Sequence, residues 1–354
     1  GSEMCIRDRY YLILFIKQVL TYNMTMNILG IESSCDDTGL AIINSDGQII
    51  NHITSSQHEI HAKYGGIVPE LASRDHVKKF IPLLQVLLEK SAMTMDDINM
   101  IAFTNGPGLL GPLLAGASLA KTLGWSNNIP TIEVNHLKAH IYSPMITEKN
   151  LKPPFISLLV SGGHTILSSV DDNFHISTLG STLDDSAGEC FDKIARELKL
   201  GYPGGPEISK RSELSKNNKF IFPRPMIKSN NYNFSFSGLK THVINTIHKL
   251  ELTNEHINNI SHEVQSAIVD TLISKSVEAS KNLGIKNIVI TGGVSANQKL
   301  RKDFSSIKEC KAYFPDVKFS TDNGAMIAYA GFLKTKSSDF KKNFTIKPEP
   351  SLTL

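Results

Sequence analysis

Short apolar runs separated by polar turns form a repeated pattern along the chain. The runs at 27–31 and 39–43 are apolar and partly β-branched, and the polar turn between them carries two adjacent carboxylates. Runs of this kind are typical of strands, and a short polar connection between two of them is typical of a hairpin. The same order of strand, turn and strand recurs at 155–160 and 165–170, around a turn that contains two glycines. The pattern therefore predicts a duplicated unit.

Helices alternate with buried strands in the rest of the pattern. The spacing at 76–90 predicts a helix, and the apolar run at 98–103 predicts a strand that leads into a glycine-rich turn and a helix at 111–123. A strand at 286–290, a tight turn and a helix at 296–304 repeat this order later. Such alternation in both halves predicts an α/β fold. With the paired hairpins, it resembles the actin-like ATPase fold of sugar kinases and chaperone ATPases, in which two similar subdomains surround a nucleotide cleft.

The chain has 354 residues, which exceeds the size at which a single hydrophobic core usually stops growing, so two domains are expected. Residues 1–25 share none of the pattern, and their apolar stretch is too short to span a bilayer. We interpret this segment as a non-native or mis-called leader. The other expected parts are a first actin-like subdomain at 26–150 that is completed by the helix after residue 322, a second subdomain at 151–321, and a basic, solvated tail at 333–354.

Composition narrows the class of protein only slightly. Hydrophobic residues make up 41% and charged residues 20%, as in ordinary globular proteins, and a net charge of +3 is too small to indicate nucleic-acid binding by itself. The four cysteines form no CxxC pair, so neither a disulfide framework nor a zinc knuckle is indicated. A cytoplasmic protein that does not enter the membrane fits these features best.

His136 and His140 are spaced to share one face of a helix and to bind one metal ion. A pair of surface histidines is the alternative, and a metal would need a third ligand. Asp322, in a polar turn before a helix, is the leading candidate, and two His with one Asp favour Fe(II), with Zn(II) close behind. A metalloprotease of the HExxH kind would need glutamate where Leu137 stands, so peptide hydrolysis is not expected.

Glycine pairs at 162–163, 204–205 and 292–293 leave backbone amides free to hold phosphate. Each pair alone is typical of an ordinary tight turn, whereas the three together indicate a nucleotide site. The sequence contains no P-loop of the GxxxxGK[ST] kind, which excludes one common phosphate-binding motif, whereas residues 106–111, GPGLLG, match the spacing of GxGxxG.

Three carboxylates are further candidates for chemistry. Asp36 and Asp37, at the tip of the first hairpin, are placed to orient a nucleophile or act as a general base, although turn formation is the alternative role. Asp192 is expected to begin a helix, where it would either accept ribose hydroxyls or cap the helix.

Basic and aromatic side chains are interleaved between residues 210 and 249, and Glu213 is the only carboxylate there. This combination suits nucleic acid, while a solvated basic face over core aromatics is the plainer alternative. The residues are Lys210, Arg211, Lys216, Lys219, Arg224, Lys228, Lys240 and Lys249, with Phe220, Phe222, Tyr232, Phe234 and Phe236.

Many long motifs, taken in order, resemble one family over residues 26–332. They are GIESSCDDTG, GGIVPELASRDH, NGPGLLGPLLAGASLAK, NHLKAH, LLVSGGHT, AGECFDKIAREL, GYPGGP, FPRP, FSFSGLKT, TGGVSAN and TDNGAMIAYAG. The family is that of the tRNA threonylcarbamoyladenosine transferases, which includes bacterial TsaD and carries an older description as a glycoprotein endopeptidase.

The resemblance implies an actin-like fold and transfer of threonylcarbamoyl from threonylcarbamoyl-adenylate to N6 of the adenosine beside the anticodon, in tRNAs that read codons beginning with A. AMP would leave. One Fe(II) per subunit, or Zn(II) in its place, would be bound by His136, His140 and Asp322, and Asp36 or Asp37 would act in catalysis. The residues implied to line the adenylate, or an ATP-type nucleotide, are Leu159, Val160, Ser161, Gly162, Gly163, Asp192, Gly205 and Asn297.

The chain departs from the family pattern at a few positions. Lys138 and Ala139 stand where bacterial members often have Glu and Gly, which leaves the histidine spacing intact. Asp37 stands where many members have Glu, so a catalytic role is implied less directly for it than for Asp36. The implied partners are tRNA and either a TsaB-like paralogue with a TsaE-like ATPase or, as in organellar members, a second copy of the chain. The rival functions are a metal-dependent glycoprotein endopeptidase and an ATP-dependent scaffold or kinase of the same fold.

Overall fold

The computed structural model describes residues 26–216, 219–335 and 344–354, so the leader expected at 1–25 and part of the basic tail lie outside the described residues. The first sheet has the strand order β3-β2-β1-β4-β5. Its strands are β1 (Ile28–Glu32), β2 (Asp37–Ile43), β3 (Ile49–Ser56), β4 (Met100–Gly106) and β5 (Thr131–Asn135).

The second sheet repeats the first, with the order β8-β7-β6-β9-β10. In each sheet the first two strands pair as an antiparallel hairpin, the third strand extends that hairpin, and the last two strands pair in parallel with the rest. The predicted duplication is therefore confirmed. The strands of the second sheet are β6 (Phe155–Val160), β7 (Thr165–Val170), β8 (Ile176–Ser181), β9 (Asn287–Thr291) and β10 (Lys311–Tyr313).

The predicted helices are confirmed, with two changes at their starts. The helix expected at 76–90 begins earlier, at Pro69, whose missing N–H costs nothing at a first helical position. The helix expected at 296–304 begins with a 3-10 turn at Gly293–Ala296. The helices are α2 (His58–Ala62), α3 (Pro69–Ser91), α4 (Leu110–Ser126), α5 (His136–Tyr142), α6 (Pro144–Thr147), α7 (Ala187–Glu197), α8 (Gly204–Glu213), α9 (Ser237–Ile247), α10 (Asn254–Leu283), α11 (Gln298–Ser305) and α12 (Gly324–Thr335).

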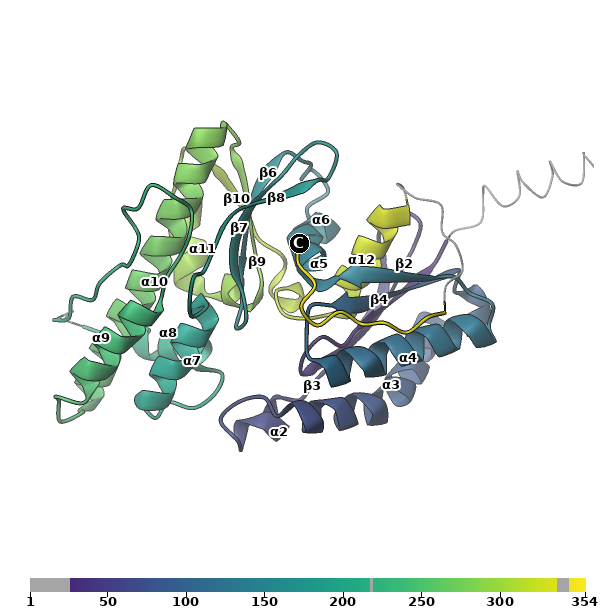
Figure 1. Ribbon diagram of the computed structural model, residues 1–354, viewed down its shortest axis with the longest axis horizontal. Coiled ribbons are helices and arrows are strands. Elements are labelled where there is room, and N and C mark those ends of the chain that lie inside the picture. The colour runs from purple at the N-terminus through teal and green to yellow at the C-terminus, as the bar shows by residue number, and fades with distance from the viewer. Residues whose placement is uncertain (1–25, 217–218, 336–343) are drawn as a thin grey trace, which may run out of the picture.

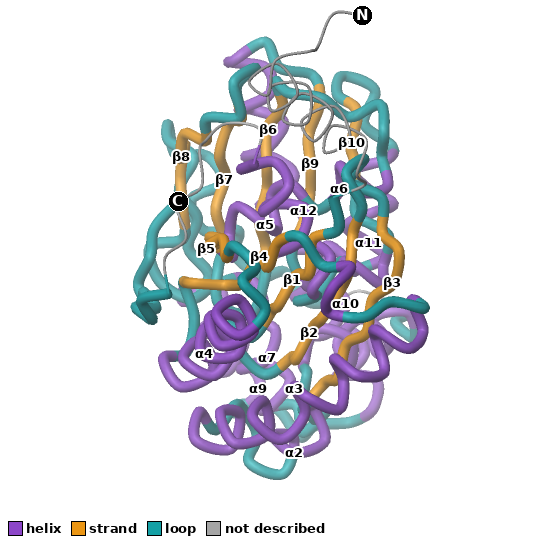
Figure 2. The backbone as a smooth tube through the Cα atoms, turned by 90° about the vertical axis from the view of Figure 1, so that its right-hand side faces the viewer, coloured by secondary structure: helices purple, strands orange, loops and turns teal. Residues whose placement is uncertain are grey.

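Helices cover both faces of both sheets (Figure 1). On the first sheet α3 and α4 pack on one face and α12 on the other, while α10 packs on the second sheet opposite α5. One apolar cluster, with Ile28, Ile132, Phe155 and Met326 among its members, joins the two sheets through α5, α6 and α12. Viewed from the side, α5 and α12 lie in front of the second sheet (Figure 2). The short helix α5 is therefore held from both halves of the molecule.

The end of the chain returns to the first sheet. The backbone N–H of Glu349 donates to the carbonyl of Asn105 at 2.7 Å, and the carbonyl of Pro350 accepts from Gly108 at 3.1 Å. The amide of Asn135 donates to the carbonyl of Thr353 at 2.8 Å. Most side chains here are exposed, as expected for a solvated tail, while the backbone is hydrogen-bonded to residues of β4 and β5 and to the turn after β4.

No helix within the described residues is both long and apolar enough to cross a membrane.

Candidate functional site

Helix α5 presents the two predicted histidines side by side. Asn135 caps this helix, because its side-chain oxygen accepts a hydrogen bond from the backbone N–H of Lys138 at 3.1 Å. His136 and His140 then lie one turn apart, and their rings meet edge to face with centroids 4.7 Å apart. Both side chains are almost fully buried. The alternative of two surface histidines is therefore wrong.

Asp322 comes to the histidines from the turn before α12. Asn323 fixes the start of that helix by accepting from the N–H of Met326 at 3.0 Å. One carboxylate oxygen of Asp322 lies 2.9 Å from Nε2 of His140 and 3.7 Å from Nε2 of His136. One ligand atom from each of the three residues lies within 4.8 Å of the others. The structure thus brings together the three residues that the sequence nominated as metal ligands.

The sequence analysis missed a fourth member of this centre, Glu32 at the end of β1. Its Oε2 lies 3.1 Å from Nδ1 of His136 and accepts a hydrogen bond from the hydroxyl of Thr104 at 2.7 Å. The carboxylate is fully buried. A carboxylate that binds the far nitrogen of a histidine fixes the orientation of the ring and makes it a better metal ligand. Glu32 therefore turns Nε2 of His136 toward Asp322.

The electrostatics of this centre fit a cation. Burial lowers the pKa of His136, but the charges of Glu32 and Asp322 outweigh burial and raise the pKa to about 9. Burial raises the pKa of Asp322, but His136 and His140 outweigh it and hold the pKa well below its usual range. The buried Nδ1 of His140 has no hydrogen-bond partner among the described residues. Two imidazoles and a carboxylate suit Fe(II) or Zn(II).

Asp36 lies in the connection between β1 and β2, and Asp37 is the first residue of β2. The charge of Asp322 acts on both carboxylates. Burial, followed by Asp322, raises the pKa of Asp37 to about 7. The same two causes raise the pKa of Asp36. A carboxylate with a raised pKa near neutrality has the proton affinity that general-base catalysis needs.

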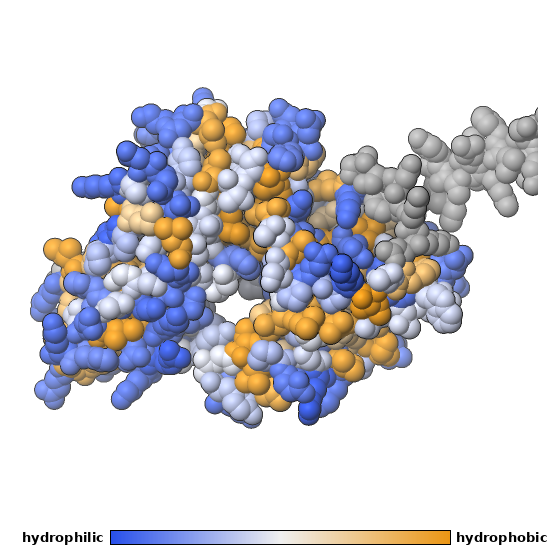
Figure 3. Space-filling model, viewed as in Figure 1, coloured by the Kyte–Doolittle hydropathy of each residue, from blue (hydrophilic) through white to orange (hydrophobic). Residues whose placement is uncertain are grey.

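Each of the predicted glycine turns leaves open space at one or both of its glycines. A side-chain carbon added at Gly162, Gly163, Gly205 or Gly293 would meet no atom within 4 Å. By contrast, Gly292 has a φ of +88° and touches the carbonyl of Val160, so it serves close packing between two strands. Between the part with α7 to α9 and the part with α2 to α4, the surface shows an open gap (Figure 3).

The other residues that were predicted to line the nucleotide are buried or contact neighbouring parts of the protein. Leu159 and Val160 are buried core residues of β6, so only their backbone can face a ligand. Asp192 lies within α7 and does not begin it, and its carboxylate accepts the N–H of Gly204 at 2.6 Å, at the start of α8. The expected position at a helix start is therefore wrong, although Asp192 does bind a helix terminus. Asn297 caps α11 and donates to Gln265 at 2.7 Å.

The aromatic side chains of the basic segment belong mainly to the core. Phe222, Phe234 and Phe236 are buried in the second half, so these three side chains are not exposed for stacking on bases. Arg224 pairs with Asp270 at 2.8 Å, and Lys240 pairs with Asp185 at 2.5 Å. This agrees with the plainer alternative of a polar face over core aromatics.

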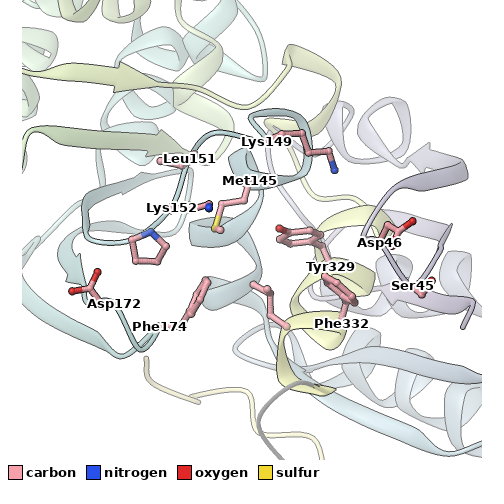
Figure 4. A pocket seen from close by; sticks show the side chains of 12 residues that line it. Ser45, Asp46, Met145, Lys149, Leu151, Lys152, Asp172, Phe174, Tyr329 and Phe332 are labelled. Atoms are coloured by element: carbon pink, nitrogen blue, oxygen red, sulfur yellow. The ribbon is translucent and has the colours of Figure 1, made fainter. Parts of the chain in front are cut away.

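A separate cavity of about 560 Å³ lies beside the later residues of α12, and none of the predicted site residues lines it (Figure 4). Its walls are Tyr329 and Phe332 of α12, the turn after β2, the segment before β6 and the turn after β7.

Taken together, the paired sheets and the His–His–Asp centre define an α/β protein of the actin-like ATPase fold with a candidate metal site. Two solved structures support this fold. HypF from T. kodakarensis matches with a TM-score of 0.60 at 14% identity, over 88% of this chain and 48% of HypF. The ADPNP-bound activator of 2-hydroxyisocaproyl-CoA dehydratase from Clostridium difficile matches with a TM-score of 0.52 at 15% identity, over 88% of this chain and 96% of the activator.

The sequence identifies the family within this fold. A family model described as tRNA N6-adenosine threonylcarbamoyltransferase, TsaD, matches residues 48–329. The chain is 46% identical to the tRNA N6-adenosine threonylcarbamoyltransferase of Thermosipho africanus, over 93% of this chain and 100% of the relative, and 45% identical to that of Ralstonia pickettii, over 88% and 92%. The chain therefore belongs to the TsaD family. It is an acyltransferase that acts on tRNA.

Proposed function

We propose that this chain transfers threonylcarbamoyl from threonylcarbamoyl-adenylate to N6 of the adenosine beside the anticodon, in tRNAs that read codons beginning with A. The proposal rests on one observation: the metal centre and the glycine turns are next to each other. Thr291, next to Gly292, donates to the carbonyl of His140 at 2.9 Å. Gly292 touches Val160, and Gly188 touches Ser161. An adenylate in the turns would thus place its acyl group toward the metal centre.

The reaction is a balanced acyl transfer. The N6 amine attacks the carbamoyl carbon, a C–N bond forms, the C–O bond to phosphate breaks, the amine loses a proton, and AMP leaves. His136, His140 and Asp322 would bind one Fe(II), or Zn(II), which supplies positive charge to the developing oxyanions when bound. Asp36 would orient the amine or accept its proton, with Asp37 as the second candidate.

The nucleotide part of the donor would lie along the turns. The backbone N–H groups of Gly162 and Gly163, with the hydroxyl of Ser161, would hold phosphate oxygens, because nothing fills the space beside these glycines. The backbone N–H of Ser161 itself donates to the carbonyl of His164 at 2.8 Å. The carboxylate of Asp192, the backbone at Gly205 and the side chain of Asn297 would contact the ribose or the base. Leu159 and Val160 would contribute their backbone only. We propose that the two sheets mark the lobes 26–150 and 151–321.

A partner protein would dock on the outer face of α3 and α4. Val77 and Ile81 on α3 are 66% and 49% exposed, and Leu110 and Leu114 on α4 are 54% and 40% exposed. Hydrophobic residues gather among polar ones on this part of the surface (Figure 3). A TsaB-like paralogue, acting with a TsaE-like ATPase, or a second copy of this chain would bury it. The molar mass in solution, alone and with the paralogue, separates the two arrangements, and the Val77→Glu/Leu114→Glu double variant should abolish either one.

The test is direct transfer from the preformed donor. Purified protein with its partner, Fe(II), threonylcarbamoyl-adenylate and unmodified tRNA should give modified adenosine on nucleoside mass analysis. Asp322→Ala should abolish the product, and Asp36→Asn should lower its rate while the metal content stays at the wild-type level. If the wild-type protein leaves adenosine unmodified, the proposed donor or acceptor is wrong.

A further inference from the structure

His76 bridges the two ends of the loop that carries Asp36 and Asp37. It lies in α3, is fully buried, and its ring stacks on Phe80 with centroids 5.6 Å apart. Nε2 lies 3.0 Å from the backbone carbonyl of Cys35, and Nδ1 lies 2.8 Å from the hydroxyl of Thr38. The only residues between these two contacts are the two candidate catalytic carboxylates.

The chemistry of the contacts fixes the protonation of the ring. A carbonyl oxygen can only accept, so Nε2 must carry the hydrogen and donate it to Cys35. Burial lowers the pKa of His76, and its hydrogen bond to Cys35 offsets this only in part. The ring is therefore neutral near pH 7, Nδ1 accepts, and the Thr38 hydroxyl donates to it. Both buried polar groups of the bridge are satisfied in this one arrangement.

The rest of the loop is held from the neighbouring strand and helix. The backbone N–H of Gln57 donates to the carbonyl of Asp36 at 3.2 Å. The side chain of Gln57 in turn contacts His61 at 3.1 Å. The N–H of Leu109 donates to the carbonyl of Ser34 at 2.8 Å, just before the loop. His76 is the residue that joins the two ends of the loop to each other.

We propose that His76 is a positioning residue for acyl transfer, which holds the Cys35–Thr38 loop so that the Asp36 and Asp37 carboxylates face the metal centre. This inference rests on the proposed function for the role of the carboxylates. His76 would not touch the substrate. Its contribution comes from geometry, because a misplacement of about 1 Å in a catalytic group can cost on the order of a hundredfold in rate.

The kinetic test removes the bridge with little change in shape. Thr38→Val keeps the volume of the side chain but removes the donor, and His76→Phe keeps the stacked ring but removes both contacts. We expect kcat to fall by roughly ten- to a hundredfold, with KM for donor and tRNA within about twofold and metal content unchanged. Phe80→Leu is the matched control, since Phe80 touches the same ring but not the loop, and it should keep kcat. If Phe80→Leu loses as much activity as Thr38→Val, the role of His76 is structural and the proposal is wrong.

The bridge also has a readout that needs no activity. In ¹⁵N NMR of histidine-labelled protein, His76 should show the Nε2–H tautomer and a pKa below that of an exposed histidine. His76→Phe should remove this resonance, and Thr38→Val should shift it. A pKa of His76 raised above that of an exposed histidine, or the Nδ1–H tautomer, would overturn the bridge. A wild-type protein with the expected resonance but no transfer would overturn the proposed function and the role given to His76, while the contact itself would stand.

Discussion

The hydroxyl of Thr291 donates a hydrogen bond to the backbone carbonyl of His140 at 2.9 Å. Thr291 is the last residue of β9, directly before the turn at Gly292 and Gly293, and His140 is a candidate metal ligand on α5. The hydroxyl of Ser143 reaches the same carbonyl at 2.9 Å. The position of α5, which carries the candidate metal ligands, therefore depends on the position of the glycine turn. His140 and Thr291 are 151 residues apart in the sequence.

Removing the hydrogen bond between Thr291 and His140 should affect both the metal site and the adenylate site. Thr291→Val keeps the shape of the side chain and removes the buried donor, so the free energy of unfolding should fall by about 1–2 kcal/mol. Affinities for metal and adenylate should both decrease, as measured by titration calorimetry. Thr178→Val, on the exposed face of β8, is the control and should change neither. A Thr291→Val protein with wild-type affinity for both ligands would contradict the coupling.

Glu32 should determine the metal affinity without binding the metal. Glu32→Gln keeps a hydrogen-bonding side chain of similar size but removes the charge beside His136, so metal affinity should fall by about ten- to a hundredfold. Fe(II) or Zn(II) titration with a competing chelator measures this. Glu70→Gln, at an exposed position of α3, should bind the metal like the wild type. Equal affinity in Glu32→Gln would mean that Glu32 does not orient the ligand.

Metal binding should depend on pH through His136. The pKa of its imidazole is about 9 in the metal-free protein, because Glu32 and Asp322 outweigh burial. Below this pH the metal must displace a proton, so the apparent association constant should rise about tenfold per pH unit up to pH 9 and then level off. Glu32→Gln removes one cause of the raised pKa and should move the plateau to lower pH. Affinity that stays constant from pH 6 to pH 8 would contradict a protonated His136.

Two glycines should respond differently to alanine. At Gly292, where φ is +88°, a side-chain carbon would lie 2.4 Å from the carbonyl of Val160, so Gly292→Ala should destabilise the fold by at least about 1–3 kcal/mol. At Gly163 a side-chain carbon meets nothing within 4 Å, so Gly163→Ala should keep the melting temperature and weaken adenylate binding. Thermal unfolding and nucleotide titration of the two variants separate packing from binding. Adenylate affinity unchanged by Gly163→Ala would remove this turn from the proposed site.

The sequence predicted those features whose cause is local. Hairpins and helices follow from the spacing of apolar residues, and the histidine pair follows from the helical repeat. Asp322 was nominated only as a polar turn residue before a helix, and the fold was needed to bring it to α5.

Other features depend on pairings between distant segments. Glu32 contacts His136 across 104 residues, through the parallel pairing of β1 with β4 and β4 with β5, and no local pattern indicates this contact. Asp192 was assigned to a helix start, whereas it binds the amide at the start of the next helix. The burial of Phe234 and Phe236 could not be inferred from the sequence. Basic residues surround them along the chain, and the pattern of charge does not show which side chains point into the core.

The central claim is that this chain moves an intact threonylcarbamoyl group from an adenylate to tRNA. The most direct measurement is the ratio of AMP released to modified adenosine formed, with radiolabelled threonylcarbamoyl-adenylate, unmodified tRNA, Fe(II) and the partner protein. We expect a ratio near one, with label in the tRNA only when the His136–His140–Asp322 centre is intact. Release of AMP with no label in the tRNA, or label transfer that is equally fast in Asp322→Ala, would contradict it.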